Sequence, residues 1–112
     1  MALRPDILRY KKDFDWLYKR GRSCGDKLVV VFQIANGLSY TRKAFVASKK
    51  VGGAVERNRA RRFMKEGFRK LEKQIKPGKD IIFIARSAIV GSSCAEVEES
   101  MRRAIEKSGL LS

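Results

Sequence analysis

Apolar residues recur at intervals of three or four positions in three stretches of the chain, and this spacing predicts three amphipathic helices. The first helix is expected over residues 11–20, where Phe14, Leu17 and Tyr18 share one face. Gly21 follows immediately, at a position where helices commonly end. The residues before this helix have only isolated apolar positions, so we expect them to be irregular.

The second helix follows a pair of glycines and is the longest of the three. Its apolar stripe consists of Ala60, Phe63, Met64, Gly67, Phe68, Leu71 and Ile75. The third helix opens at a capping box, in which the side chains of Ser93 and Glu96 each accept a hydrogen bond from the other residue's backbone N–H. Its inner face is expected to carry Val97, Met101, Ala104 and Ile105.

Three shorter stretches are rich in β-branched and other apolar residues and are predicted to be strands. They span residues 28–35, 42–47 and 80–85. Asn36-Gly37 directly follows the first strand, and because this dipeptide favours tight hairpin turns, the first two strands are predicted to pair antiparallel. The third strand, DIIFIA, is apolar enough to lie in the centre of a sheet.

The predicted order of elements is therefore α-β-β-α-β-α, without repeats or linkers. A chain of 112 residues is long enough for one core and too short for two independent ones. One sheet with helices packed on it is the simplest architecture for this order. We therefore expect residues 1–112 to form a single α+β domain.

The charge of the chain indicates a strongly anionic partner. There are 26 lysines and arginines against 12 aspartates and glutamates, giving a net charge of +14 and an isoelectric point near 10.3. Eleven of the cations and only three glutamates lie between positions 49 and 76, so this stretch alone carries a net charge of +8. Nucleic acid and a membrane surface are the partners that such a charge favours.

The cations of the second helix lie on the face opposite its apolar stripe. Arg61, Arg62, Lys65, Arg69 and Lys73 gather on that face, Asn58 and Arg59 extend it, and Arg57 borders the stripe. Arginine predominates, and its guanidinium group makes bidentate contacts with phosphates and base edges that a lysine ammonium group does not make. An ordinary solvated helix surface is the alternative, but such a surface carries more acidic residues than this one.

A membrane-surface protein or a DNA-binding protein would also be basic. The apolar face of the second helix is expected to pack on the rest of the protein, which leaves no second apolar face to enter lipid. No apolar run approaches the roughly 18 residues of a spanning helix, and the start of the chain lacks the apolar stretch of a signal peptide. We therefore expect a cytoplasmic protein that binds neither membrane nor DNA.

The loop between the second strand and the second helix is a candidate phosphate site. It contains Lys49 and Lys50, followed by Gly52 and Gly53. The glycines allow close approach of the backbone, and the amides at the start of a helix create a favourable field for an anion. A glycine turn between a strand and a helix needs no ligand, so the lysines are what makes this loop a candidate.

Three aromatic residues form a second group of candidates. Phe14 and Tyr18 share a helix face, and Phe32 lies on a predicted strand. An exposed ring stacks on an unpaired base with a gain of about 1 to 3 kcal/mol. Packing in the core is the commoner role of any single aromatic side chain, and the sequence leaves both roles open.

Other chemistry is limited by the residue types present. The chain has no histidine, which removes the commonest general base and metal ligand. Cys24 and Cys94 lie far apart without a C-x-x-C pair, and we interpret both as reduced thiols. We therefore expect no catalytic residue and no metal site in this chain.

The order of these motifs resembles the protein subunit of bacterial ribonuclease P over about residues 8–107. F-x-x-L-Y-x-x-G covers the first helix, and S-K-K-V-G-x-A-V-x-R-N-R-x-R-R-x-x-K-E-x-F-R covers the glycine loop and the second helix. D-I-I-F-I-A-R covers the last strand. The central block is the most specific part, because the arginine-asparagine-arginine signature occurs together with the lysine-glycine loop before it and the helix after it.

The resemblance implies a small basic protein that binds a large catalytic RNA in a complex that removes the 5′ leader of precursor tRNA. The RNA and the Mg²⁺ ions bound mainly by it perform the hydrolysis. The residues that would face the catalytic RNA are Lys49, Lys50, Arg57, Asn58, Arg59, Arg61, Arg62, Lys65 and Arg69. The residues that would line a cleft for the single-stranded leader are Phe14, Tyr18, Phe32 and Arg86.

The family fold is similar to a domain of a small-subunit ribosomal protein. It implies an α/β sandwich with a mixed sheet of about four strands and a left-handed β-α-β crossover, although the right-handed form is the general rule. The protein is expected to be monomeric without RNA. A non-catalytic ribosomal or RNA-chaperone protein with the same fold and charge is the alternative interpretation.

Overall fold

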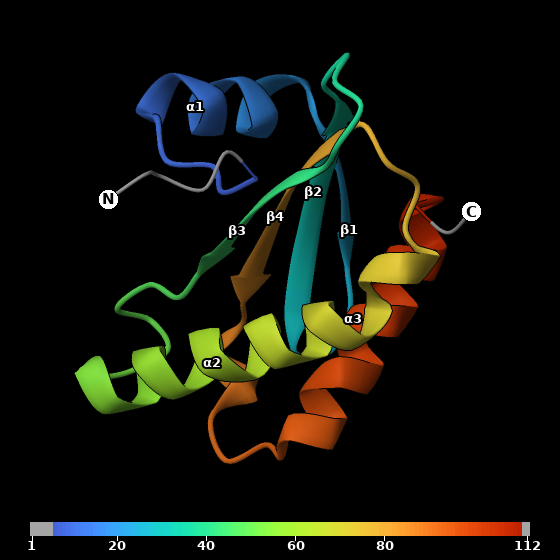
Figure 1. The fold of residues 1–112 in the computed structure, drawn as a ribbon. Helices are drawn as coiled ribbons and strands as arrows, with labels where there is room; N and C mark the ends of the chain where they lie inside the picture. Colours follow the sequence, from blue (N-terminus) through green and yellow to red (C-terminus); the bar gives the residue numbers. More distant parts are fainter. Residues whose placement is uncertain (1–5, 111–112) are drawn as a thin grey trace, which may run out of the picture.

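The computed structural model describes residues 6–110, which contain three α-helices and four strands (Figure 1). In chain order these are α1 (Lys11–Arg20), β1 (Arg22–Gly25), β2 (Val29–Ala35), β3 (Arg42–Val46), α2 (Ala54–Leu71), β4 (Lys79–Ala85) and α3 (Cys94–Ser108). Short 3-10 turns follow α2 at Glu72–Gln74 and β4 at Ser87–Ile89. The three predicted helices and the three predicted strands are all present.

The strands form one mixed sheet in the order β1-β2-β4-β3. β2 runs antiparallel to β4, with Val29 opposite Ala85, and β3 runs parallel to β4, with Phe45 opposite Phe83. β4 therefore lies in the interior of the sheet, and its residues Ile81, Ile82 and Phe83 are fully buried. The predicted central position of this strand is confirmed.

The predicted antiparallel pairing of residues 28–35 with residues 42–47 is wrong, because β4 lies between β2 and β3. Asn36-Gly37 does turn the chain, with Gly37 at a φ of 73°. The turn leads across the sheet, however, and the N–H of Asn36 donates to the carbonyl of Gly78 before β4, at 2.9 Å. β4 carries the continuous apolar run IIFI at residues 81–84, and the central position pairs both edges of the strand and buries most of this run.

β1 has no counterpart in the sequence prediction, which therefore contains one strand too few. Its residues, RSCG, lack the alternation of apolar and polar residues that marks a strand, and most of them are exposed. They become a strand because the outer edge of β2 offers antiparallel pairing, which places Cys24 opposite Val31. This strand depends on a tertiary contact and not on its own sequence.

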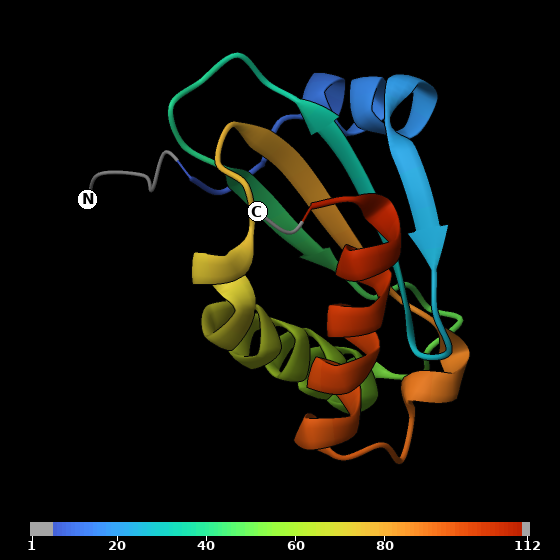
Figure 2. The same ribbon diagram turned by 90° about the vertical axis from the view of Figure 1, so that its right-hand side faces the viewer.

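The β3-α2-β4 unit connects two adjacent parallel strands in the left-handed sense. In Figure 1 both strands run downward, α2 lies in front of the sheet, and β4 lies to the right of β3. Figure 2 places α2 and α1 on opposite sides of the sheet. The left-handed crossover implied by the family resemblance is thus present, against the general right-handed preference.

Helices cover both faces of the sheet and create two clusters of buried side chains. On one face, α2 and α3 pack against the sheet through Met64, Phe68, Val97, Met101 and Ile105, among others. On the other face, α1 and the segment before it form a smaller cluster of Leu8, Leu17, Ala44 and Ile82. The predicted stripe of α2 is buried except for Phe63, which is half-buried, and the predicted stripe of α3 is buried throughout.

A buried carboxylate joins α3 to the turn between β1 and β2. Asp26 accepts hydrogen bonds from the Ser100 hydroxyl at 2.7 Å, from Arg103 at 3.0 Å and from Lys107 at 3.1 Å. The Ser100 oxygen also accepts from the backbone N–H of Leu28. Burial raises the pKa of Asp26, but the hydrogen bonds from Arg103, Ser100 and Lys107 outweigh burial and hold this pKa well below its usual range.

We expect Asp26→Asn to lower the free energy of unfolding by about 1 to 3 kcal/mol at neutral pH, because Arg103 and Lys107 lose a charged partner. The pKa of Asp26 is lower in the folded protein than in the unfolded chain, where it is about 3.9. The wild-type protein therefore loses this contribution as the pH falls below about 4 and toward the folded pKa. Urea unfolding of both proteins across this pH range measures the difference.

The matched control is Asp15→Asn, which removes an exposed carboxylate that pairs with Lys11 on the same helix. An exposed pair of this kind contributes about 0 to 1 kcal/mol, so this variant should unfold much like the wild type. A difference between wild type and Asp26→Asn that stays constant from neutral to acidic pH would contradict the assignment.

Candidate nucleic-acid interface

The loop that leads into α2 presents its lysines and its backbone to solvent. Lys49 and Lys50 are exposed, whereas Val51 is buried and anchors the loop. Gly52 has a φ of 146°, which side-chain-bearing residues rarely adopt. Gly53 caps α2 without any side-chain hydrogen bond to the first amides of the helix. The first N–H groups of α2 are thus left without an N-cap acceptor, and the predicted phosphate site stays a prediction.

The candidate residues of α2 lie on its outer face. Asn58, Arg59, Arg62, Lys65 and Arg69 are exposed, and Arg57 and Arg61 are half-buried. The opposite face of the same helix is held in the core by Met64 and Phe68. The helix is thus fixed in place by its apolar face while its cations project outward.

Most of these cations have no acidic partner. Within residues 6–110, Arg69 is the only member of the predicted catalytic-RNA set that forms an ion pair, with Glu66 at 2.5 Å. Arg59 and Arg62 place their guanidinium groups over the ring of Phe63, at 5.1 and 5.5 Å from its centroid. The protein therefore leaves this positive charge largely uncompensated, as binding to a polyanion requires.

Arg57 borders the apolar stripe, as predicted, and is half-buried. Its Nε is buried and has no hydrogen-bond partner in the part of the chain that the structure describes. A buried donor without an acceptor costs about 1 to 3 kcal/mol, and such donors are rare in folded proteins. An acceptor from outside the protein would be stabilising at this position.

The aromatic candidates come together on the opposite side of the sheet. The ring of Tyr18 lies 6.4 Å from that of Phe14 and 5.2 Å from that of Phe32, which it meets edge-on. Tyr18 is 42% exposed, and the two phenylalanines are half-buried. Each ring therefore packs on one side and is open on the other. The rings thus combine the two roles that the sequence leaves open, packing in the core and exposure for stacking. Burial raises the pKa of the Tyr18 hydroxyl, which stays neutral near pH 7.

Arg86 directly follows β4. Because side chains alternate along a strand, Arg86 falls on the same face of the sheet as the aromatic group. Its guanidinium group donates to the backbone carbonyl of Asp26 at 3.2 Å, which places it near the turn between β1 and β2. Half-buried Val30 and Ile84 are paired neighbours on this face. This face is thus an apolar floor, with the ring cluster and Arg86 bordering it.

A charged network of the sheet also reaches α1. Arg42 of β3 forms two hydrogen bonds with Asp80 of β4, at 2.8 and 2.6 Å, and lies 3.8 Å from Asp13 of α1. Asn36 donates to the same Asp80 carboxylate at 2.9 Å. The hydrogen bond with Asp80 raises the pKa of Arg42, which stays charged. No sequence pattern marks these residues as a group, because the partners are more than twenty positions apart.

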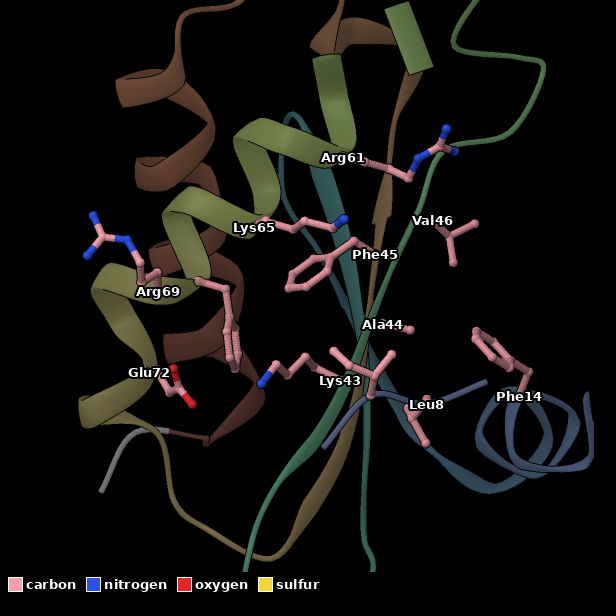
Figure 3. Close-up of a pocket in the computed structure, with 12 residues that line it drawn as sticks. Leu8, Phe14, Lys43, Ala44, Phe45, Val46, Arg61, Lys65, Arg69 and Glu72 are labelled. Carbon is pink, nitrogen blue, oxygen red and sulfur yellow. The ribbon is translucent and has the colours of Figure 1, made fainter. Parts of the chain in front are cut away.

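A cavity of about 650 Å³ lies along the outer edge of β3 (Figure 3). Its walls include Phe14 from the aromatic group and Arg61 and Lys65 from α2, with Phe45 and Val46 of β3 between them. In Figure 3, Lys65 extends toward Phe45, whereas Arg69 points away from the other lining residues. In the sequence, the short apolar run of β3 is indistinguishable from an ordinary strand and does not mark these residues as part of a site.

Several other features bear on function. Among residues 6–110, no group of three or more cysteine, aspartate or glutamate side chains is placed to hold a metal ion. No helix within the described part of the chain is both long and apolar enough to cross a membrane. Cys24 and Cys94 are free thiols, as predicted.

Known proteins match this chain over nearly its whole length. A family model for ribonuclease P matches residues 3–109. The ribonuclease P protein component of Alkaliphilus metalliredigens is 41% identical, over 94% of this chain and 95% of that protein. The corresponding protein of Clostridioides difficile is 36% identical, over 96% of this chain and 95% of that protein.

Solved structures give the same result. The RNase P protein of Staphylococcus aureus has a TM-score of 0.88 and 27% identity, and the match covers 97% of this chain and all of that one. The RNase P protein of Thermotoga maritima has a TM-score of 0.82 and 30% identity, with 90% of this chain and 96% of that chain covered.

Fold and surface charge together define a small basic RNA-binding protein with an α+β sandwich. The chain belongs to the ribonuclease P protein family. It is thus the protein subunit of a ribonucleoprotein endoribonuclease that processes tRNA, and its partners are the ribonuclease P RNA and precursor tRNA. In this family the RNA catalyses phosphodiester hydrolysis.

Proposed function

We propose that this protein binds its two RNA partners on opposite sides of its sheet. The catalytic RNA contacts the outer face of α2 and the loop before it, and the 5′ leader of precursor tRNA lies between α1 and the sheet. The protein thereby holds the leader in a fixed position relative to the catalytic RNA and promotes leader removal.

The uncompensated charge on α2 is the observation that supports the first assignment most strongly. Arg59, Arg62 and Lys65 have no acidic partner within residues 6–110, and the helix that carries them is anchored in the core. Arginines held on a rigid helix approach phosphates without a large loss of side-chain freedom, because the planar guanidinium is already oriented. The unpaired Nε of Arg57 adds a donor at the border of the same face.

The aromatic cluster supports the second assignment. Phe14, Tyr18 and Phe32 offer partly open rings, which stack on bases of any sequence because every base has a π face. Arg86 adds a positive charge on the same side of the sheet. A mature tRNA lacks the leader that this surface would hold, so the surface would favour the precursor.

Mg²⁺ enters this proposal as an ion bound mainly by the catalytic RNA. The described residues do not gather the ligands with which the protein alone would hold such an ion. The cations of α2 screen the repulsion between RNA phosphates, and the Mg²⁺ concentration needed for folding and cleavage falls as a result. We place the protein in the cytoplasm, where bacterial tRNA precursors are made, and expect it to be monomeric without RNA.

Reconstitution tests the function directly. Adding the protein to a bacterial ribonuclease P RNA at low Mg²⁺ should increase the cleavage of precursor tRNA, and the increase should shrink as Mg²⁺ is raised. An unchanged cleavage rate at low Mg²⁺, together with binding to ribosomal RNA, would favour the ribosomal or chaperone alternative instead.

Arg62→Ala should weaken assembly with the catalytic RNA and reduce the slope of log affinity against log salt by about 1, because one phosphate contact is lost. Arg59→Ala should act in the same way. Filter binding over a range of salt concentrations measures the slope.

Arg102→Ala is the matched control for these arginine variants. Arg102 lies on α3 and pairs with Glu99 and Glu106, so its charge is already compensated. This variant should keep the wild-type slope. If Arg59→Ala and Arg62→Ala also kept it, α2 would not contact phosphates.

Phe14→Ala should leave assembly with the catalytic RNA unchanged and reduce the preference for precursor over mature tRNA about fivefold or more, because a stacking contact of at least about 1 kcal/mol is lost. Affinities of the holoenzyme for both tRNAs give this ratio. Phe14→Leu is the matched control for packing, since it keeps an apolar side chain but removes the ring. Equal loss of affinity for both tRNAs would place Phe14 in the core alone.

A further inference from the structure

The outward face of α1 and the residue that precedes the helix carry aromatic side chains that the core does not use. Trp16 is 53% exposed, and Tyr10, at the start of the helix, is 57% exposed. The inward face of the same helix is already occupied by Phe14, Leu17 and Tyr18, which pack toward the sheet. The two exposed rings are therefore dispensable for the packing of α1.

Cations accompany both rings. The guanidinium carbon of Arg20 lies 5.4 Å from the centroid of the Trp16 ring, and Nζ of Lys12 lies 6.0 Å from that of Tyr10. Lys12, Trp16 and Arg20 are spaced four residues apart, so they follow one line along the helix. The arrangement combines rings for stacking with cations for phosphates.

The acidic residues of α1 do not neutralise this line of side chains. Asp15 pairs with Lys11 at 2.9 Å, and Asp13 turns toward Arg42 of the sheet at 3.8 Å. Within residues 6–110, neither Lys12 nor Arg20 forms an ion pair with a carboxylate. The face is consequently cationic and aromatic at once, which is the combination that favours single-stranded nucleic acid over a protein or lipid partner.

We propose that this face binds unpaired nucleotides of the 5′ leader that lie upstream of those in the cleft. A base stacks on Trp16, and Lys12 and Arg20 contact the neighbouring phosphates. The proposal rests on the placement of the leader between α1 and the sheet. The catalytic RNA is the less suitable occupant, because its proposed surface on α2 lies on the other side of the sheet (Figures 1 and 2).

The geometry of α1 allows one strand to use both faces. A helix with its side chains is only about 10 to 12 Å across, so a strand that leaves the cleft past Tyr18 reaches Trp16 by following the helix surface. Tyr18 is itself 42% exposed and marks the border between the two faces. Short leaders would end within the cleft, and only longer ones would reach Trp16.

Leader length therefore tests the proposal. The affinity of the reconstituted holoenzyme is measured for precursors whose leaders are lengthened stepwise. Trp16→Ala should leave the affinity for the shortest leaders unchanged and weaken that for long leaders about fivefold or more, because a stacked base is lost. Trp16→Phe should restore part of this loss, because it keeps a ring. Tyr40→Ala, which removes an exposed ring from the loop between β2 and β3, should have no effect at any length.

Fluorescence provides an independent readout, because Trp16 is the only tryptophan in the chain. Its emission in the holoenzyme should change when a precursor with a long leader binds and stay constant with a short one. Phe14→Ala separates this proposal from the function of the cleft, since loss of the cleft weakens the affinity for precursors with leaders of every length. The proposal would be overturned if the emission stayed constant with long leaders. It would also be overturned if Trp16→Ala lowered the affinity for precursors equally at all leader lengths. An effect of Trp16→Ala on the self-association of the holoenzyme alone would overturn the proposal as well.

Discussion

The burial of β4 is the constraint on which the rest of the structure depends. Its backbone pairs with β2 on one edge and β3 on the other, and its side chains meet α2 and α3 on one face and α1 on the other. Phe83 stacks on Phe45 at 5.9 Å and meets Phe68 at 5.7 Å, which joins β4, β3 and α2. A strand surrounded in this way leaves no free edge, and the helices on its two sides are held in fixed relative positions.

This arrangement separates two kinds of surface. α2 directs an apolar stripe into the core and a row of arginines outward, so its position is set by packing and its charge faces solvent. The other side of the sheet is only partly covered by α1, because α1 is short and is held over β2 and β4 by Leu17, with a further contact between Arg42 and Asp13. The uncovered part is apolar and aromatic, with few charges. One surface thus suits phosphates and the other suits bases, and the sheet holds them apart.

Much of the candidate site follows from helical periodicity. The positions of Arg59, Arg62 and Lys65 on the outer face of α2 follow from the stripe of Met64 and Phe68 on its inner face, because 3.6 residues per turn assign every side chain of one helix a direction. The capping box of α3 also follows from sequence, since Ser93 and Glu96 are neighbours in the chain and their mutual hydrogen bonds are present. Strand pairing does not follow in this way. Asn36-Gly37 marks a turn, but the strand inserted beside β2 comes from more than forty positions later.

By itself, the sequence determined the local elements, the face that each helix buries, and the concentration of positive charge on one of them. These depend on interactions between residues a few positions apart. The tertiary structure alone decided the order of the strands, the presence of β1, the partial exposure of Phe14, Tyr18 and Phe32, and the network around Asp80. Each of these depends on which distant segment fills the space beside another, and the gain from burying β4 outweighs the local preference of Asn36-Gly37 for a hairpin.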